Sequence, residues 1–157
     1  MRQSAIVGSI EIAAFPATVY GLITDLSSWD RFAVETRIPG GVLPRELVPG
    51  TTFHAWNRNG LWLWRTTTTV LHAEPFRTLA FEVKSFGRPV SAWRYDIVPT
   101  ERGSRVTEST RDMRGKAMCL LSVAVTGVVD RDARNRRNID LTLMQLKAAA
   151  EKPAQSG

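Results

Sequence analysis

Cysteine is nearly missing from this chain, whose 157 residues include only one, Cys119. A single cysteine cannot form an internal disulfide, and its isolation fits a protein of the reducing cytoplasm. Because Cys119 lies in an apolar run, we expect it to be buried and inert rather than a reactive nucleophile.

Histidine is equally scarce, and the patterns that hold metals or phosphates are missing too. Neither of the two histidines, His54 and His72, has a partner at metal-ligand spacing. Gly40-Gly41 and Gly87 lack the pattern of a glycine-rich phosphate loop. We therefore expect no bound metal and no cofactor.

No apolar run is long enough to cross a membrane. The longest, residues 118–129, contains Ser122, Thr126 and Gly127, and it falls short of the ~20 apolar residues that a membrane helix needs. Glu11 interrupts the apolar start of the chain, and no cleavage-site pattern follows it. We therefore expect neither a transmembrane segment nor a signal peptide.

The overall composition is that of a soluble globular protein, with 43% hydrophobic and 23% charged residues. A chain of this length favours a single domain. We expect that domain to cover residues 1–151, followed by a disordered tail over residues 152–157. The protein would act as a monomer or a homodimer.

Acidic residues are outnumbered by lysine and arginine, 15 to 21, which leaves a net charge of +6. The basic residues cluster in segments 111–116 and 131–137. Such a surface could meet RNA, an acidic protein or anionic lipid, whereas DNA is not an expected partner. The alternative is a solvated helix face, because Asp130, Asp132 and Asp140 interrupt the arginines.

Aromatic residues make up only 8% of the chain, but four of the five tryptophans fall between residues 56 and 93. Trp62 and Trp64 are two apart, and so are Trp93 and Tyr95. Two-residue spacing places side chains on the same face of a strand. That face either fills a core or lines a cavity for an apolar guest.

The hydrophobic pattern predicts the element order β-α-β-β-β-β-β-α. The expected strands are 5–13, 51–57, 61–73, 78–84, 90–98 and 104–113. The last of these strands is polar on both faces, so we expect it to be exposed or to lie at an edge. The expected helices begin at Phe15-Pro16 and at Val128, with a loop or short helix over residues 118–127.

The predicted C-terminal helix, residues 128–151, carries an apolar stripe that has to be buried. Its members are Ile139, Leu143, Leu146 and Ala150, joined by Thr142. In an α+β fold with an antiparallel sheet, the partner for that stripe is the concave face of the sheet. A cavity remains if helix and sheet do not close completely.

Five stretches of this chain resemble a known group of proteins. They are Ser9–Ile12 with Phe15–Tyr20, Thr24–Trp29, Leu61–Trp64 leading into Glu74-Pro75, Trp93–Pro99 with Gly103–Glu108, and Leu143–Lys147. In order and spacing they resemble the START/Bet v 1-like (SRPBCC) superfamily, and more closely its polyketide cyclase/dehydrase and lipid-transport group, common in actinobacteria. The resemblance implies a helix-grip fold, with a curved antiparallel β-sheet wrapped around a long C-terminal helix and a cavity between them.

Members of this group bind lipids, sterols or polyketides, and some are aromatase/cyclases. In those enzymes the Trp-x-Trp strand continues inward through a small polar residue to an arginine. Carried onto this chain in two-residue steps, the inward set is Trp62, Trp64, Thr66 and Thr68, with Thr68 at the arginine position. Arg65 has the opposite parity and should not reach the cavity. This departure favours binding over cyclisation.

We therefore predict that the cavity binds an apolar or aromatic small molecule, lipid-like or polyketide-like. The predicted binding residues are Trp56, Trp62, Trp64, Thr66, Thr68, Phe81, Trp93 and Tyr95, capped by Leu143 and Leu146. Trp29, after the first helix, could either close one end of the cavity or hold the helix to the sheet.

Two alternatives remain open. A polyketide cyclase or dehydratase would need an ionisable group in the cavity, and His54 and Tyr95 are the candidates. His54 shares parity with Trp56 and could face the cavity, or it could be a histidine hydrogen-bonded at the strand surface. The other alternative is a protein or RNA interaction module that uses basic segments 111–116 and 131–137.

Overall fold

The computed structural model describes residues 5–153, which fold around one curled antiparallel sheet of seven strands. The strands are β1 Ile6–Ile12, β2 Thr36–Arg37, β3 Thr52–Asn59, β4 Trp62–Glu74, β5 Thr78–Ser85, β6 Arg88–Thr100 and β7 Gly103–Asp112. Their order across the sheet is β1-β7-β6-β5-β4-β3-β2. Of the tail predicted over 152–157, residues 154–157 lie outside the described residues.

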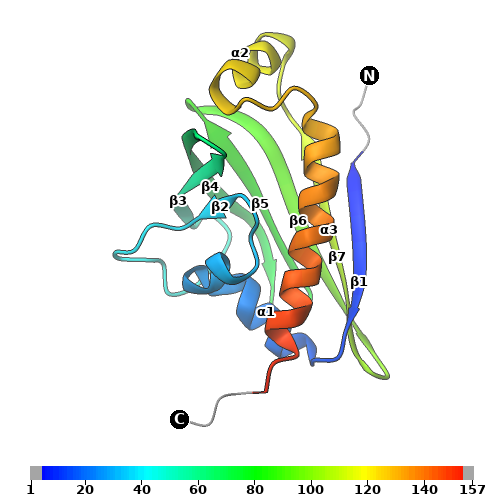
Figure 1. Ribbon diagram of the computed structural model, residues 1–157. Helices are drawn as coiled ribbons and strands as arrows, with labels where there is room; N and C mark the ends of the chain where they lie inside the picture. Colours follow the sequence, from blue (N-terminus) through cyan, green and yellow to red (C-terminus); the bar gives the residue numbers. More distant parts are fainter. Residues whose placement is uncertain (1–4, 154–157) are drawn as a thin grey trace.

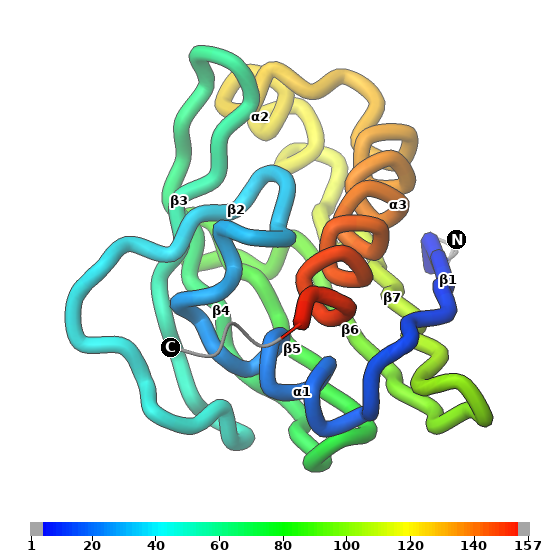
Figure 2. Tube along the Cα trace, turned by 60° about the horizontal axis from the view of Figure 1, so that its bottom comes forward, coloured from blue at the N-terminus to red at the C-terminus, as the bar shows by residue number. Residues whose placement is uncertain are grey.

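Four helical segments accompany the sheet. They are α1 Pro16–Thr24, the 3-10 helix η1 Leu26–Arg31, α2 Lys116–Thr126 and α3 Arg131–Ala150. Figure 1 shows α3 running across the concave face of the sheet, with α1 near one end and α2 beyond the other. Seen from the end in Figure 2, the sheet curls around the helix, which confirms the predicted helix-grip fold.

Helix α1 begins at Phe15-Pro16, as its sequence predicts. Pro16 occupies the first turn, where its missing N–H interrupts no hydrogen bond. Val19 and Ile23 are completely buried. In η1 the indole Nε1 of Trp29 donates a hydrogen bond to the Ile23 carbonyl at 3.1 Å, which ties the two helical segments together.

The apolar stripe of α3 is buried as predicted. Its buried members include Ile139, Thr142, Leu143, Leu146 and Ala150. The helix begins at Arg131, because Gly127 ends α2 in the left-handed conformation and Asp130 accepts a capping hydrogen bond from the Ala133 backbone N–H.

The prediction that strand 104–113 is exposed or at an edge is wrong. Strand β7 lies inside the sheet, between β1 and β6. Every second residue of β7 is buried, namely Ser104, Val106, Glu108 and Thr110. Three of these four inward side chains are polar, so the sequence of β7 lacks the alternation of apolar and polar residues that indicates a buried strand.

Candidate functional site

A cavity of about 110 Å³ lies on the inner face of the sheet, against α3 and the segment after η1. Its aromatic lining consists of Trp29, Trp64, Phe81, Trp93 and Tyr95. Its polar lining includes Glu35, Asn57, Thr66, Thr68, Glu108, Arg131, Asn138 and Thr142. Apolar walls with a few polar groups are typical of small-molecule sites, although most such sites are larger, roughly 300–1,000 Å³.

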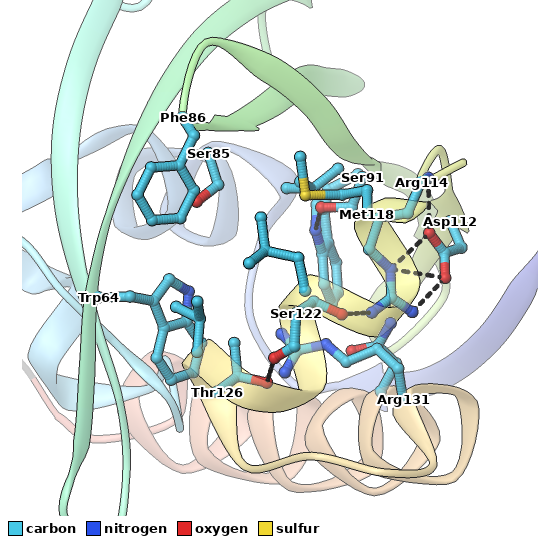
Figure 3. Close-up of a pocket in the computed structure, with 15 residues that line it drawn as sticks. Trp64, Ser85, Phe86, Ser91, Asp112, Arg114, Met118, Ser122, Thr126 and Arg131 are labelled. Carbon is cyan, nitrogen blue, oxygen red and sulfur yellow. Dashed lines mark hydrogen bonds and ion pairs between the residues drawn. The ribbon is translucent and has the colours of Figure 1, made fainter. Parts of the chain in front are cut away.

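A second pocket, of about 60 Å³, lies beside this cavity and beneath α2 (Figure 3). The two share the lining residues Trp64, Val90, Ser91, Trp93 and Arg131. Figure 3 shows Met118, Ser122 and Thr126 of α2 on one side of the pocket, facing Trp64 and the turn at Phe86. Helix α2 therefore forms one wall of the space next to the cavity.

Strand parity puts the predicted residues of β4 on the inner face. Trp64, Thr66 and Thr68 are 7%, 5% and 3% exposed, whereas Arg65 between them is exposed. No arginine of β4 reaches the cavity, as predicted. An arginine does line it from another element, because the Arg131 guanidinium of α3 lies 5.8 Å from the centre of the Trp64 ring.

The prediction that Trp56 lines the cavity is wrong, and of the two positions considered for His54 the structure shows the one at the strand surface. In the β3–β4 ladder Asn57 lies opposite Trp64, and Trp56 lies opposite Arg65. Residues opposite each other across antiparallel strands share a face, so Asn57 points inward and Trp56 outward. Trp56 is 40% exposed, and the exposed His54 ring pairs through Nδ1 with Thr67 Oγ1 at 3.2 Å. His54 is thus the surface histidine of the alternative interpretation.

Three other predicted residues do not line the cavity. Trp62 shares the face of Trp64 but lies at the start of β4, 46% exposed and against Gly127. Leu143 and Leu146 are fully buried in the core instead. The helix contributes Asn138 and Thr142 to the cavity, so its wall there is polar rather than aliphatic.

The remaining aromatic predictions lie where expected. Phe81 and Trp93 are direct partners across the β5–β6 ladder, and both line the cavity with Tyr95. Of the two roles considered for Trp29, the structure supports the one that holds the helical segment to the sheet, because its ring packs edge-on against Phe53 of β3 with ring centres 5.8 Å apart. The same indole lines the cavity.

Within residues 5–153, Glu108 is the one carboxyl side chain on the strands of the cavity wall, and the sequence analysis missed it together with Glu35, Asn57, Arg131, Asn138 and Thr142. It lies opposite Tyr95 in the β6–β7 ladder and is 2% exposed. The Tyr95 hydroxyl donates a hydrogen bond of 2.8 Å to Glu108 Oε1, while Oε2 has no hydrogen-bond partner within residues 5–153. Burial raises the pKa of the Glu108 carboxyl to about 8, and burial followed by the adjacent carboxyl raises the pKa of Tyr95.

A cluster of charged side chains forms one rim of the cavity. Glu35 Oε2 accepts hydrogen bonds from Arg131 Nη2 at 3.0 Å and from Asn138 Nδ2 at 3.4 Å, and Arg134 lies 3.8 Å from its other oxygen. In the pocket under α2, Arg114 is paired with Asp112 and donates to Ser122 Oγ at 2.6 Å (Figure 3).

These ion pairs involve arginines of the two basic segments that a protein or RNA interaction module would use. Arg114 of segment 111–116, and Arg131 and Arg134 of segment 131–137, are bound to carboxylates of the same chain. Arginines held in this way are less available to phosphates of an RNA partner. Binding of a protein or RNA partner would therefore depend on the remaining basic side chains of segments 111–116 and 131–137.

Residues 5–153 contain neither a metal-binding cluster nor a membrane-spanning helix. Within this range no three histidine, cysteine, aspartate or glutamate side chains come together in a way that could hold a metal ion. In the same range no helix is long and apolar enough to span a bilayer.

The chain matches the family model described as polyketide cyclase / dehydrase and lipid transport over residues 3–151. No curated protein matches it significantly. Among solved structures, protein CV1439 from Chromobacterium violaceum has a TM-score of 0.74 and 12% identity, over 96% of this chain and 100% of that one.

Two other solved structures share the fold. The Polyketide_cyc-like protein Cgl2372 from Corynebacterium glutamicum has a TM-score of 0.60 and 24% identity, over 96% of this chain and 92% of its own. Aha1 from Colwellia psychrerythraea, whose structure is a dimer, has a TM-score of 0.68 and 17% identity, over 99% and 100% of the two chains.

Proposed function

The chain belongs to the polyketide cyclase / dehydrase and lipid transport family, and on that basis we propose that it binds an apolar or aromatic small molecule between its sheet and α3. One observation carries the proposal, namely the aromatic lining of the cavity. Trp64, Phe81, Trp93 and Tyr95 come from three neighbouring strands and present their rings to one space. Burying apolar area against such rings stabilises a complex by about 25 cal/mol per Å² before entropic costs.

The size of the cavity restricts the guest. Its volume of about 110 Å³ is close to that of an apolar cavity of roughly 150 Å³ that accepts benzene. A guest about the size of one aromatic ring therefore fits the cavity best. A longer lipid-like or polyketide-like guest would extend into the pocket of about 60 Å³ beneath α2 and displace that helix.

The proposal is tested by replacing one indole inside the cavity and one outside it. In Trp64→Ala the guest loses about 50 Å² of apolar contact, which corresponds to about 1.3 kcal/mol or about tenfold in affinity. Trp56→Ala removes an indole from the outer face of the adjacent strand and should leave affinity within about twofold. Calorimetric titration with α-methylstyrene measures both, and circular dichroism confirms that each variant folds. Equal affinities in the two variants would refute the proposed site.

Cyclisation or dehydration of a polyketide-like substrate in the same cavity is the second candidate function. It is supported by the hydrogen-bonded pair of Tyr95 and Glu108, which supplies an ionisable group beside the aromatic rings. A carboxyl whose pKa lies near 8 could exchange a proton with a substrate at neutral pH.

A further inference from the structure

The Glu108 carboxyl is a buried polar group that the fold alone does not explain. It projects from β7 into the cavity wall and is 2% exposed. Its Oε2 atom has no hydrogen-bond partner within residues 5–153. A buried polar atom without a partner destabilises a fold, and in the wall of a cavity such an atom is available to a guest that can complete its hydrogen bond.

The hydrogen bond from Tyr95 determines whether Oε2 of Glu108 acts as a hydrogen-bond donor or acceptor. The tyrosine hydroxyl has one proton and donates it to Glu108 Oε1 at 2.8 Å. Burial raises the pKa of the Glu108 carboxyl to about 8, so the group carries a proton at neutral pH. With Oε1 accepting from the tyrosine, that proton resides on Oε2, which becomes a donor.

The charged groups around the cavity do not supply a counter-ion for this carboxyl. Glu35 and Arg131, which line the cavity from the segment before β2 and from α3, are hydrogen-bonded to each other. The β1 residue opposite Glu108 is Gly8, and α3 adds the uncharged side chains Asn138 and Thr142. The carboxyl is therefore buried without a counter-ion, which favours its neutral form.

A neutral O–H donor at the wall of an aromatic cavity selects a particular kind of guest. A carbonyl oxygen accepts such a hydrogen bond, whereas a hydrocarbon leaves the donor unpaired and a carboxylate would bring a negative charge into a buried site. We propose that Glu108, held by Tyr95, anchors apolar guests through a carbonyl oxygen, so that the ligands of this cavity are small aromatic or aliphatic ketones and related neutral carbonyl compounds. This inference rests on the proposed binding function.

Two probes of nearly the same shape separate the inference from the proposed function. Acetophenone carries a carbonyl group where α-methylstyrene carries a methylene group, and calorimetric titration at pH 6.5 compares them. We expect the wild-type protein to bind acetophenone about tenfold more tightly, because only the ketone accepts the hydrogen bond. Glu108→Leu should abolish this preference, whereas Glu101→Leu, at the exposed turn between β6 and β7, should retain it.

A second variant keeps the test valid if Glu108→Leu does not fold. Glu108→Gln retains an N–H donor and the size of the side chain, so its preference for the ketone should not change between pH 6.5 and pH 9.5. In the wild type the same preference should fall at least fivefold over this range, because the carboxyl loses its proton near pH 8.

The outcomes are distinct. Equal wild-type affinity for both probes, or tighter binding of 1-phenylethylamine than of acetophenone at pH 6.5, overturns the carbonyl anchor and leaves the binding function standing. Failure of both probes to bind overturns both proposals.

Discussion

At the scale of single residues, Glu108 dominates the energetics of the cavity. The ordinary pKa of such a carboxyl is 4.5, and burial raises it to about 8 in the folded protein, while the hydrogen bond from Tyr95 acts in the opposite direction. Between these two values the folded state binds a proton that the unfolded state has released. The free energy of unfolding therefore falls as pH rises from about 4.5 to about 8.

Replacing this carboxyl should make the stability of the protein less dependent on pH between about 4.5 and about 8. Glu108→Gln cannot ionise, so its free energy of unfolding relative to wild type should increase between pH 5 and pH 8 by on the order of 2–4 kcal/mol. Urea unfolding at the two pH values measures this difference. Glu101→Gln, at an exposed turn, should show no such trend, and a parallel pH dependence of Glu108→Gln and wild type would contradict the assignment.

At the scale of elements, the contact between α3 and β1 holds the helix in the sheet. A Cβ atom at Gly8 would lie 2.5 Å from Ile139 Cγ2 and 3.3 Å from Leu143 Cδ1, so the absent side chain lets the helix lie directly on the strand. The C-terminal end of α3 is tied to the same region, because Lys147 Nζ donates to the Glu11 carbonyl at 2.8 Å and Glu151 accepts from Ala13 N–H at 2.7 Å.

A side chain at Gly8 should push the helix away from the strand. We expect Gly8→Ala to lower the free energy of unfolding by about 1–3 kcal/mol through overpacking. Gly21→Ala is the matched control, because a Cβ there meets nothing within 4 Å and alanine favours the helix by about 1 kcal/mol. Chemical denaturation measures the free energy of unfolding of both variants. A neutral or stabilising effect of Gly8→Ala would show that α3 shifts away from β1 without cost.

At the scale of the whole molecule, α2 is the part of the fold that covers the pocket beside the cavity. It packs mainly against β4, and its only fully buried residue is Thr126. Leu120 is 78% exposed and Leu121 47%. In contrast, α3 is buried along its length against β1 and β7. A helix with so few buried contacts opens at a lower free energy than the rest of the domain.

Hydrogen exchange should reveal this difference. Backbone amides of α2 should exchange at least about tenfold faster than those of α3, since local opening of α2 breaks few buried contacts. Saturating 2-acetonaphthone, a two-ring guest long enough to extend from the cavity into the pocket beneath α2, should slow exchange in α2, while amides in β1, whose residues do not line either pocket, keep their rates. Mass spectrometry of the deuterated protein measures both. Equal protection of α2 and α3 would argue against entry of the guest beneath α2.

Most of the fold could be predicted because its helices and strands are specified by the periodicity of apolar side chains within each element. The buried stripe of α3 and the inward positions of Trp64, Thr66 and Thr68 follow from periodicity within one element, and the structure confirms them. Trp62, the fourth member of the predicted inward set, is 46% exposed because it lies at the start of the strand. Trp56 could not be assigned in this way. Its face depends on the register of β3 against β4, and the small Ala55 beside it, rather than the large indole, points inward.

The amino-acid sequence by itself determined the fold class, the helix that grips the sheet and the aromatic wall, because side-chain periodicity depends only on neighbours along the chain. The tertiary structure alone decided that Glu108 faces Tyr95 inside a cavity, and that Asn138 and Thr142 rather than Leu143 and Leu146 complete its wall. Glu108 meets Tyr95 through the pairing of β7 with β6, and Asn138 and Thr142 come from α3. The additional pairing of β7 with β1, the last and the first strand of the chain, makes β7 an interior strand. Such distant pairing turns a polar strand into a buried one, and no local pattern encodes it.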